Sequence, residues 1–266
     1  MTEIQESLLV KLGFRFGING THAARTMMLD DLRVLFSRTP AEASRADYVR
    51  AIVDDNVLGK STKSARQLAW RHLGTLYGFD TTYPIFRALR RLWSLDEAAQ
   101  PLLALAVALA RDPLLRGTQA FIVGQAPGTQ VTREETEAFL DRSHPQRFSP
   151  ASLRSFAQNV AGTWTAAELL AGHRRKLRSQ PAKRPESIAL LLFLAYLEGR
   201  TGQRLFTSDW TSLIGGSPDE LEALTNSASH RGLLVFMNAG GVKEVRFPGY
   251  LTPQEECIRE EASRVH

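Results

Sequence analysis

The sequence of 266 residues contains one cysteine, Cys257, which excludes an internal disulfide and a metal cluster built from cysteines. Long hydrophobic runs are missing as well. The two longest, 102–110 and 188–197, are about half the length that crosses a bilayer. No secretory signal pattern is found at the start of the sequence. These absences predict a protein of the reducing cytoplasm without a membrane segment.

Histidines and acids are present, but they form no catalytic or metal-binding pattern. The six histidines lie far apart, with no pair at the spacing that places two ligands on one helix face. Adjacent acids such as Asp30-Asp31 point to different helix faces. No Gly-x-Ser-x-Gly elbow occurs. The sequence therefore predicts a non-catalytic protein without cofactor or metal, although a site assembled from distant residues would escape such a search.

Acidic residues are scarce in two segments. Residues 58–93 contain seven Lys and Arg against one acid, and residues 142–184 contain nine against one. These segments carry +6 and +8, so a net charge of +5 leaves −9 on the rest of the chain. If the two segments meet in space, they make a positive surface of the kind that binds polyanions.

Residues 56–77 are a loop followed by a predicted helix, 61–77, with a one-sided basic face. On a helical wheel its apolar side chains fall on one side and most of its cations on the other. Serine and threonine at its start can cap free amides, and such a helix start suits an anion. Gly59-Lys60-Ser61-Thr62 looks like the end of a P-loop, but that motif needs a glycine where this chain has Asp54. A nucleotide hydrolase is therefore rejected, and an ordinary solvated helix face is the plainer alternative to a binding surface.

Apolar residues recur at helical spacing through most of residues 21–126, which predicts a helical bundle. Expected helices cover the ranges 22–38, 41–53, 83–93, 96–111 and 113–123. The run 102–110 is apolar on every side, so its helix should lie at the centre. Thr132 and Glu135 form a capping box for a helix that ends near Leu140.

The polar stretch 143–150 predicts a division between a region 1–145 and a region 146–266. Ser149 and Pro150 then start a helix whose polar face carries Arg154. The run 173–185 is the densest in Lys and Arg and is interrupted by prolines. It is interpreted as a flexible linker or as an arm that binds nucleic acid.

The last third of the chain predicts three helices and a hairpin. The helices cover 185–198, 207–214 and 217–230, and the strands cover 233–237 and 242–247. This is the order of a winged helix. Its would-be recognition helix begins with Asp219, Glu220 and Glu222, which repel phosphate, so contacts with proteins are favoured over base reading.

A family resemblance is carried by three segments: Asn56-Val57-Leu58-Gly59-Lys60-Ser61-Thr62-Lys63-Ser64, Leu109-Ala110-Arg111-Asp112-Pro113-Leu114-Leu115-Arg116, and Arg147-Phe148-Ser149-Pro150-Ala151-Ser152-Leu153-Arg154-Ser155 with Gln158, Asn159 and Trp164 downstream. In this order they resemble the BrxA family of bacterial BREX phage-defence systems and span about residues 20–172. The resemblance implies a non-catalytic accessory protein with a NusB-like helical part that binds double-stranded DNA. It also implies partners from the same locus: a methyltransferase, a phosphatase-like protein and an ATPase.

The predicted fold is mainly α, with a NusB-like bundle followed by a winged-helix-like region that carries one short β-hairpin. The predicted function is antiviral: cytoplasmic binding of duplex DNA as an accessory component of a BREX-type system. Charge and helix-face arguments select the candidate phosphate contacts, which are Lys60, Lys63, Arg66, Arg71, Arg147, Arg154, Arg174, Arg175, Lys176 and Arg178. Two alternatives stay open: a scaffold that docks other defence proteins, and RNA binding by analogy with NusB.

Overall fold

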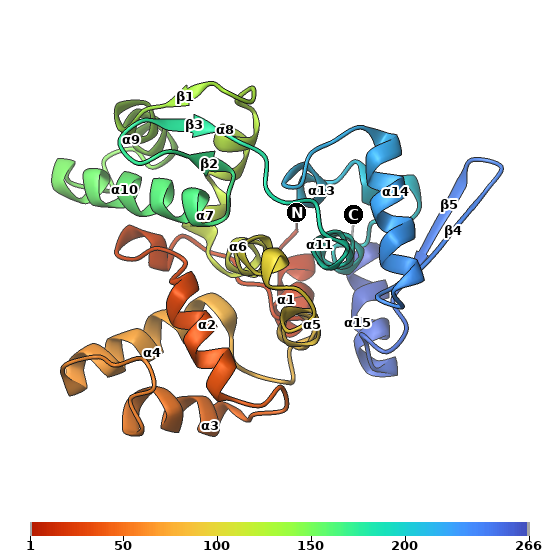
Figure 1. Cartoon of the computed structure of the whole chain (residues 1–266), viewed down its shortest axis with the longest axis horizontal. Coiled ribbons are helices and arrows are strands. Elements are labelled where there is room, and N and C mark those ends of the chain that lie inside the picture. The colour runs from red at the N-terminus through yellow and green to blue at the C-terminus, as the bar shows by residue number, and fades with distance from the viewer. Residues whose placement is uncertain (1, 265–266) are drawn as a thin grey trace.

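Residues 2–264 are described by a computed structural model, which is mainly helical (Figure 1). The amino-terminal helices are α1 (Glu3–Lys11), α2 (Leu29–Arg38), α3 (Arg45–Val49), α4 (Lys63–Tyr77), α5 (Pro84–Trp93), α6 (Gln100–Arg111), α7 (Pro113–Arg116), α8 (Gln119–Val123), α9 (Arg133–Ser143) and α10 (Pro150–Ala166), with the short turns η1 (Thr21–Ala23), η2 (Arg50–Asp54) and η3 (Glu97–Ala99). The carboxy-terminal helices are α11 (Pro185–Leu197), α12 (Gln203–Phe206), α13 (Asp209–Ser212), α14 (Pro218–His230) and α15 (Pro253–Arg264). The strands are β1 (Gln130–Val131), β2 (Leu170–Ala171), β3 (Lys176–Arg178), β4 (Val235–Ala239) and β5 (Val242–Arg246).

Helices α5, α6 and α11 form the centre of the molecule. Every residue of α6 is buried, as its uninterrupted apolar run predicts, and α11 is buried almost completely. Each fully buried leucine contributes about 1.5–3 kcal/mol relative to an exposed one, so this pair of helices makes a large apolar contribution to stability. Figure 1 shows the remaining elements around them, with α2 to α4 and α7 to α10 on one side and α14 with the β4–β5 hairpin on the other.

The expected helix over 22–38 is wrong for its first part. The chain forms only the turn η1 at Thr21–Ala23, and α2 starts at Leu29 after Met28, whose φ of 54° is left-handed. The reason lies far along the chain: the Thr163 hydroxyl accepts the Met27 amide at 2.9 Å, which holds this segment extended against α10. The spacing of apolar residues within 22–38 cannot show a partner that lies so far along the chain.

A small antiparallel sheet of order β1-β3-β2 was not predicted. Its central strand β3 lies inside the run 173–185 that was interpreted as a flexible linker or arm. Gln130 pairs with Leu177, and Leu170 pairs with Arg178. The expected division at 145/146 is crossed by this sheet and by the packing of α9 against α10. Contacts also cross residues 179–184, since α11 packs against α5 and α6 and α15 packs against α1.

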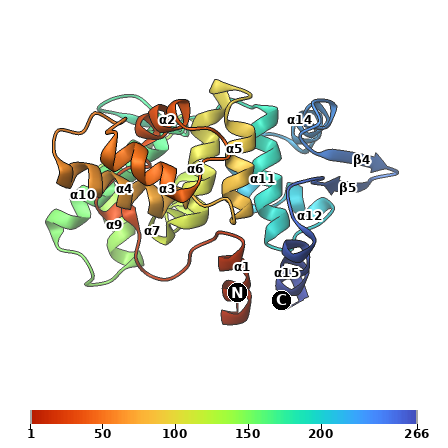
Figure 2. The same ribbon diagram turned by 90° about the horizontal axis from the view of Figure 1, so that it is seen from below.

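The carboxy-terminal elements include the predicted helices and hairpin, with one short helix, α12, that was not predicted. The box formed by Ser217 and Glu220 caps α14, and β4 pairs with β5 around a turn at Gly240 and Gly241. The hairpin projects away from the helices, while α15 returns to pack against α1 near both termini (Figure 2).

In the part of the chain that the structure describes, no single helix has the length and apolar character to cross a membrane. Only Glu97–Arg111 and Pro113–Val123, bent by 107° at their junction, reach that length and composition together.

Candidate nucleic-acid interface

Helix α4 presents the basic face that its sequence predicts. The Thr62 hydroxyl accepts the Ala65 amide at 3.1 Å and caps its start. Ala69, Leu73 and Leu76 are buried, while the opposite face leaves its polar side chains exposed: Lys63, Gln67 and Arg71. Neither Lys63 nor Arg71 has an ion pair within the described residues. This face is therefore available to a ligand.

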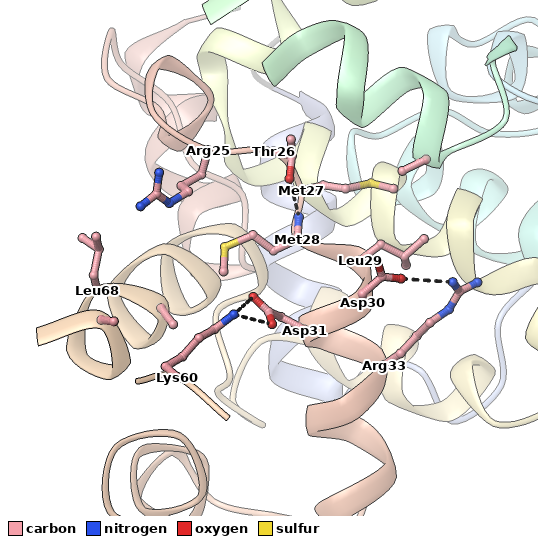
Figure 3. A pocket seen from close by; sticks show the side chains of 13 residues that line it. Arg25, Thr26, Met27, Met28, Leu29, Asp30, Asp31, Arg33, Lys60 and Leu68 are labelled. Carbon is pink, nitrogen blue, oxygen red and sulfur yellow. Dashed lines mark hydrogen bonds and ion pairs between the residues drawn. The ribbon is translucent and has the colours of Figure 1, made fainter. Parts of the chain in front are cut away.

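The loop before α4 does not hold an anion in the way its sequence suggests. The Asn56 side chain accepts the Lys60 amide at 2.8 Å and donates to the Lys60 carbonyl at 3.1 Å, which closes the loop on itself. The Lys60 ammonium lies 2.8 Å from the Asp31 carboxylate on α2 (Figure 3). Lys60 was predicted as a phosphate contact, but this partner already neutralises its charge.

Arg66 is half-buried and ties α4 to η2. Its Nη1 donates to the Val53 carbonyl at 2.8 Å. Because the η2 carbonyls are free at the end of that turn, a guanidinium satisfies them well. This prediction is also corrected, because the geometry makes Arg66 a structural tie rather than an exposed cation.

Helix α10 carries the next group of predicted contacts. The Ser149 hydroxyl accepts the Ser152 amide at 3.2 Å, Pro150 occupies the first turn, and Phe156, Val160 and Trp164 are buried. On the opposite face Arg154 is exposed and has no ion pair within residues 2–264.

Arg147 lies in the loop just before α10. Its Nη2 donates to Asn19 at 3.0 Å and its guanidinium lies 4.9 Å from the centre of the Phe148 ring. Both partners are uncharged, so the charge of Arg147 stays available to an anion.

The turn between β2 and β3 brings three more cations beside α10. Arg174 is exposed, Arg175 donates to Gln130 at 2.5 Å, and the Lys176 ammonium donates to the Gly172 carbonyl at 2.7 Å. With Gln158 of α10, Arg174 and Lys176 line a pocket of about 440 Å³ that also contains Glu134.

Arg178 is the clearest correction. Only 7% of it is exposed, and its guanidinium donates to the carbonyls of Ile122, Leu169 and Ser179. Burial lowers the pKa of this guanidinium. Arg178 therefore holds the small sheet against α8 and cannot reach a phosphate.

The two basic segments lie at the same end of the molecule. Figures 1 and 2 place α4 and α10 on one side of the central helices, and both contact η1. Between them lies a pocket of about 720 Å³, whose lining includes Arg25 and Lys60 together with Asp30 and Asp31 (Figure 3). The α4 residues that line this pocket are Ala65, Leu68 and Ala69, so Lys63 and Arg71 face away from it, and Arg174 and Lys176 line the separate pocket beside Gln158.

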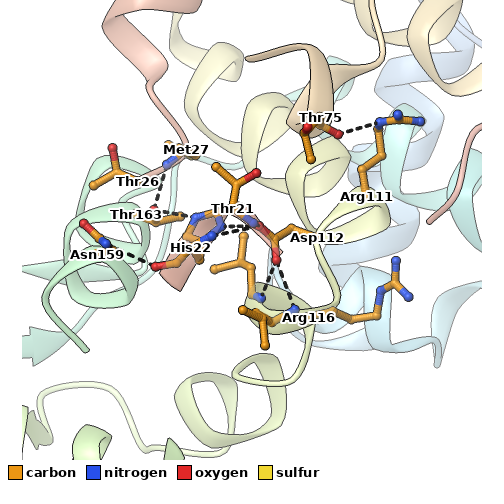
Figure 4. Close-up of polar contacts among 12 residues, drawn as sticks. Thr21, His22, Thr26, Met27, Thr75, Arg111, Asp112, Arg116, Asn159 and Thr163 are labelled. Atoms are coloured by element: carbon orange, nitrogen blue, oxygen red, sulfur yellow. Dashed lines mark hydrogen bonds and ion pairs between the residues drawn. The ribbon is translucent and has the colours of Figure 1, made fainter. Parts of the chain in front are cut away.

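A buried polar cluster that the sequence did not reveal lies beneath this end (Figure 4). His22 Nδ1 lies 2.8 Å from the Asp112 carboxylate, and His22 Nε2 lies 2.9 Å from the Thr163 hydroxyl. All three side chains are completely buried. Asp112 also accepts the amides of Thr21 and Leu115, at 2.6 and 3.1 Å. Burial raises the pKa of Asp112, but the hydrogen bond and charge of His22 outweigh it and hold that pKa below its usual value.

An acid, a histidine and a hydroxyl in this order have the form of a nucleophilic triad. Here the Thr163 hydroxyl is also occupied by the Met27 amide, and no solvent reaches the group. The cluster joins η1, the α6–α7 junction and α10. Its chemistry is structural.

Residues 2–264 contain no group of three or more His, Cys, Asp or Glu side chains placed to hold a metal ion. No protein-family model matches the chain, and no curated protein matches its sequence.

Proposed function

We propose that this protein is a non-catalytic accessory factor that binds duplex DNA through its α4 and α10 end. The observation that carries the proposal is a set of accessible Lys and Arg side chains at one end of the molecule, none of which has a carboxylate partner within the described residues: Lys63, Arg71, Arg147, Arg154, Arg174, Arg175 and Lys176. Cations of this kind are the groups that displace counterions from a phosphate backbone.

We further propose a BREX-type phage-defence role, as the likeness of three segments to the BrxA family implies. Two of these segments contain residues of the buried cluster or its neighbours, namely Asp112 in 109–116 and Asn159 after 147–155, whose amide donates to the His22 carbonyl at 3.1 Å. The likeness thus includes residues that shape the proposed surface. A NusB-like amino-terminal part and a winged-helix-like region at 185–246 belong to the same proposal.

The carboxy-terminal region favours a second function, docking of a protein partner. Two of the three acids at the start of α14 are already paired, Glu220 with Lys183 at 3.1 Å and Glu222 with Lys243. The β4–β5 hairpin exposes 39% of Val235, 43% of Met237 and 74% of Val242. Exposed apolar side chains on a projecting hairpin suit contact with another protein better than contact with phosphate.

The experiment that tests DNA binding is a charge reversal with a matched control. Lys63, Arg71 and Arg154 are changed together to Glu, and a second variant carries the same change at Arg204, Arg246 and Arg264, which are also exposed. Both variants lose six units of net charge. We expect the first to weaken duplex binding by at least about 100-fold at low salt and the second by less than about 5-fold, since each lost phosphate contact acts locally.

Equal loss in both variants would contradict the proposal, because net charge alone would then explain binding. Unchanged binding in the first variant would contradict it as well. Circular dichroism and thermal unfolding of both variants check that the fold is kept. Parallel titrations with single strands and duplex RNA distinguish DNA from the RNA alternative.

A further inference from the structure

A second cationic feature lies at the far end of α4, away from the pocket of Figure 3. It is a pocket of about 580 Å³. Four arginines line it, Arg15, Arg45, Arg71 and Arg111, together with four further residues of α4: Gln67, Trp70, Gly74 and Thr75. Gln67, Arg71 and Gly74 follow one another at helical spacing, so one stripe of α4 forms a wall of the pocket. The lining contains no carboxylate.

Two of the four arginines are held in place by contacts that leave part of the guanidinium unused. Arg111 is 7% exposed and donates from Nε to the Thr75 carbonyl at 3.2 Å and from Nη1 to the Gly13 carbonyl. Arg45 donates from Nη1 to the Gly78 carbonyl at 3.3 Å and lies 5.2 Å from the centre of the Trp70 ring. A guanidinium has five N–H donors, so each keeps donors for a ligand.

The other two arginines are less constrained. The Arg15 amide donates to the Ala110 carbonyl at 3.0 Å, which places this residue beside the end of α6. Arg71 is exposed on α4. Within residues 2–264, neither side chain has a hydrogen bond or an ion pair with the protein.

The charge of this pocket is not compensated. None of the four guanidinium groups pairs with a carboxylate in the described chain, although nearby Arg87 pairs with Glu255 at 2.6 Å. Burial, together with the charges of Arg15 and Arg45, lowers the pKa of Arg111 to about 10 against the opposite effects of Tyr83 and Asp80. The Asp80 carboxylate itself accepts the Thr82 amide and hydroxyl at 2.9 and 2.7 Å. Four like charges around one cavity repel one another, and this repulsion destabilises the folded protein unless an anion enters the cavity.

The geometry points to a binding site for a phosphate group in this pocket, with Arg15, Arg45 and Arg71 as its ligands and Arg111 as the fixed wall. Guanidinium groups pair with phosphate through parallel N–H to oxygen bonds, and a tetrahedral dianion accepts from several of them at once. Trp70 is not a platform for a base, because Arg45 and Phe79, whose ring centre lies 5.9 Å away, already cover it. The ligand is therefore defined by its phosphate.

This inference goes beyond the proposed DNA surface, since the phosphate can come from a free anion or from a nucleic-acid backbone. Pyrophosphate is titrated at low salt while tryptophan fluorescence is recorded, because a ligand that moves Arg45 changes the surroundings of Trp70. The measurement is repeated with Arg45→Gln, Arg15→Gln and Trp70→Phe, and with Arg91→Gln as an exposed control outside the pocket. Direct calorimetry checks binding without relying on fluorescence.

For a free anion, we expect saturable pyrophosphate binding that weakens at least about 10-fold in Arg45→Gln and Arg15→Gln and is unchanged in Arg91→Gln. For a backbone phosphate, pyrophosphate binding is weak but duplex DNA loses at least about 5-fold affinity in the same two variants and none in the control. The inference is overturned if both variants bind pyrophosphate and duplex as the parent does. DNA binding that depends on Lys63 and Arg154 but not on Arg45, together with pyrophosphate binding that does not change in Arg45→Gln, would overturn this site and leave the proposed function standing.

Discussion

The two ends of the molecule use their cations differently. In the carboxy-terminal region several basic side chains pair with acids: Arg231 with Glu186, Lys243 with Glu222 and Lys183 with Glu220. At the α4 and α10 end, Lys63, Arg71, Arg154 and Arg174 have no such partner in the described chain. Lys and Arg content alone does not separate these two situations. What separates them is whether a carboxylate lies within reach.

The largest expected effect concerns the buried cluster of His22, Asp112 and Thr163, which lies beneath the α4 and α10 end. Changing Asp112 to Ala leaves His22 and several buried amides without their acceptor, which costs about 3 kcal/mol or more of unfolding free energy. Urea unfolding measures it. Asp30→Ala, which removes a 97% exposed carboxylate, should cost less than about 0.5 kcal/mol. Equal losses would show that Asp112 does not join these elements.

The next effect concerns a paired arginine against an unpaired one. Arg87 on α5 donates to Glu255 at 2.6 Å and to the Tyr250 carbonyl at 3.1 Å, so it holds α15 to the centre. We expect Arg87→Ala to cost about 1–2 kcal/mol, and Arg154→Ala to cost less than about 0.5 kcal/mol while weakening duplex binding. Both variants are measured by denaturant unfolding and by DNA titration. A larger loss of unfolding free energy in Arg154→Ala than in Arg87→Ala would contradict the comparison.

The pH dependence of stability sharpens the same contrast. Burial raises the pKa of Glu255, but the hydrogen bonds from Arg87 and Thr252 and the charge of Arg87 together outweigh it and hold that pKa below the ordinary 4.5. A carboxyl whose pKa is lowered on folding contributes stability above about pH 4.5 and loses it as the pH falls through the folded value. The parent should therefore lose more stability between pH 5 and 3 than Arg87→Ala does. The free energy of unfolding of both proteins is measured from pH 5 to pH 3. Equal losses in the two proteins would contradict this expectation.

The smallest expected effect converts a paired cation into an unpaired one. Asp31→Asn removes the carboxylate 2.8 Å from the Lys60 ammonium and frees that charge on the edge of the pocket of Figure 3. We expect duplex affinity to rise about 2- to 5-fold at low salt and to return to the parent value in the Asp31→Asn, Lys60→Gln double variant. An affinity that does not rise would place Lys60 outside the binding surface.

Much of the helical architecture was predictable, because its signals are local. The apolar run 102–110 gave the buried helix, and Thr132, Ser149 and Ser217 each cap a helix as expected. The extended segment before α2 and the strand β3 were missed, since the partners of Met27 and of Leu177 lie 136 and 47 residues away.

In the candidate site, too, local patterns were predictable and contacts between distant residues were not. Helix faces identified Lys63, Arg71 and Arg154 as exposed, but no pattern in the sequence shows that Asp31 neutralises Lys60 or that carbonyls enclose Arg178. The pocket of four arginines escaped for the same reason. Arg15 and Arg45 lie outside the segments that are richest in basic residues, and only the fold brings them beside Arg71.

The most direct test is the salt dependence of duplex affinity. If about six phosphates are contacted, the slope of log K against log salt should lie near −5, and Arg154→Gln should reduce its magnitude by about 0.9. Arg246→Gln, at a residue whose guanidinium lies 2.6 Å from Glu244, should leave the slope unchanged. A slope near zero, or an equal reduction by both variants, would contradict the claim that unpaired cations at the α4 and α10 end bind the phosphate backbone.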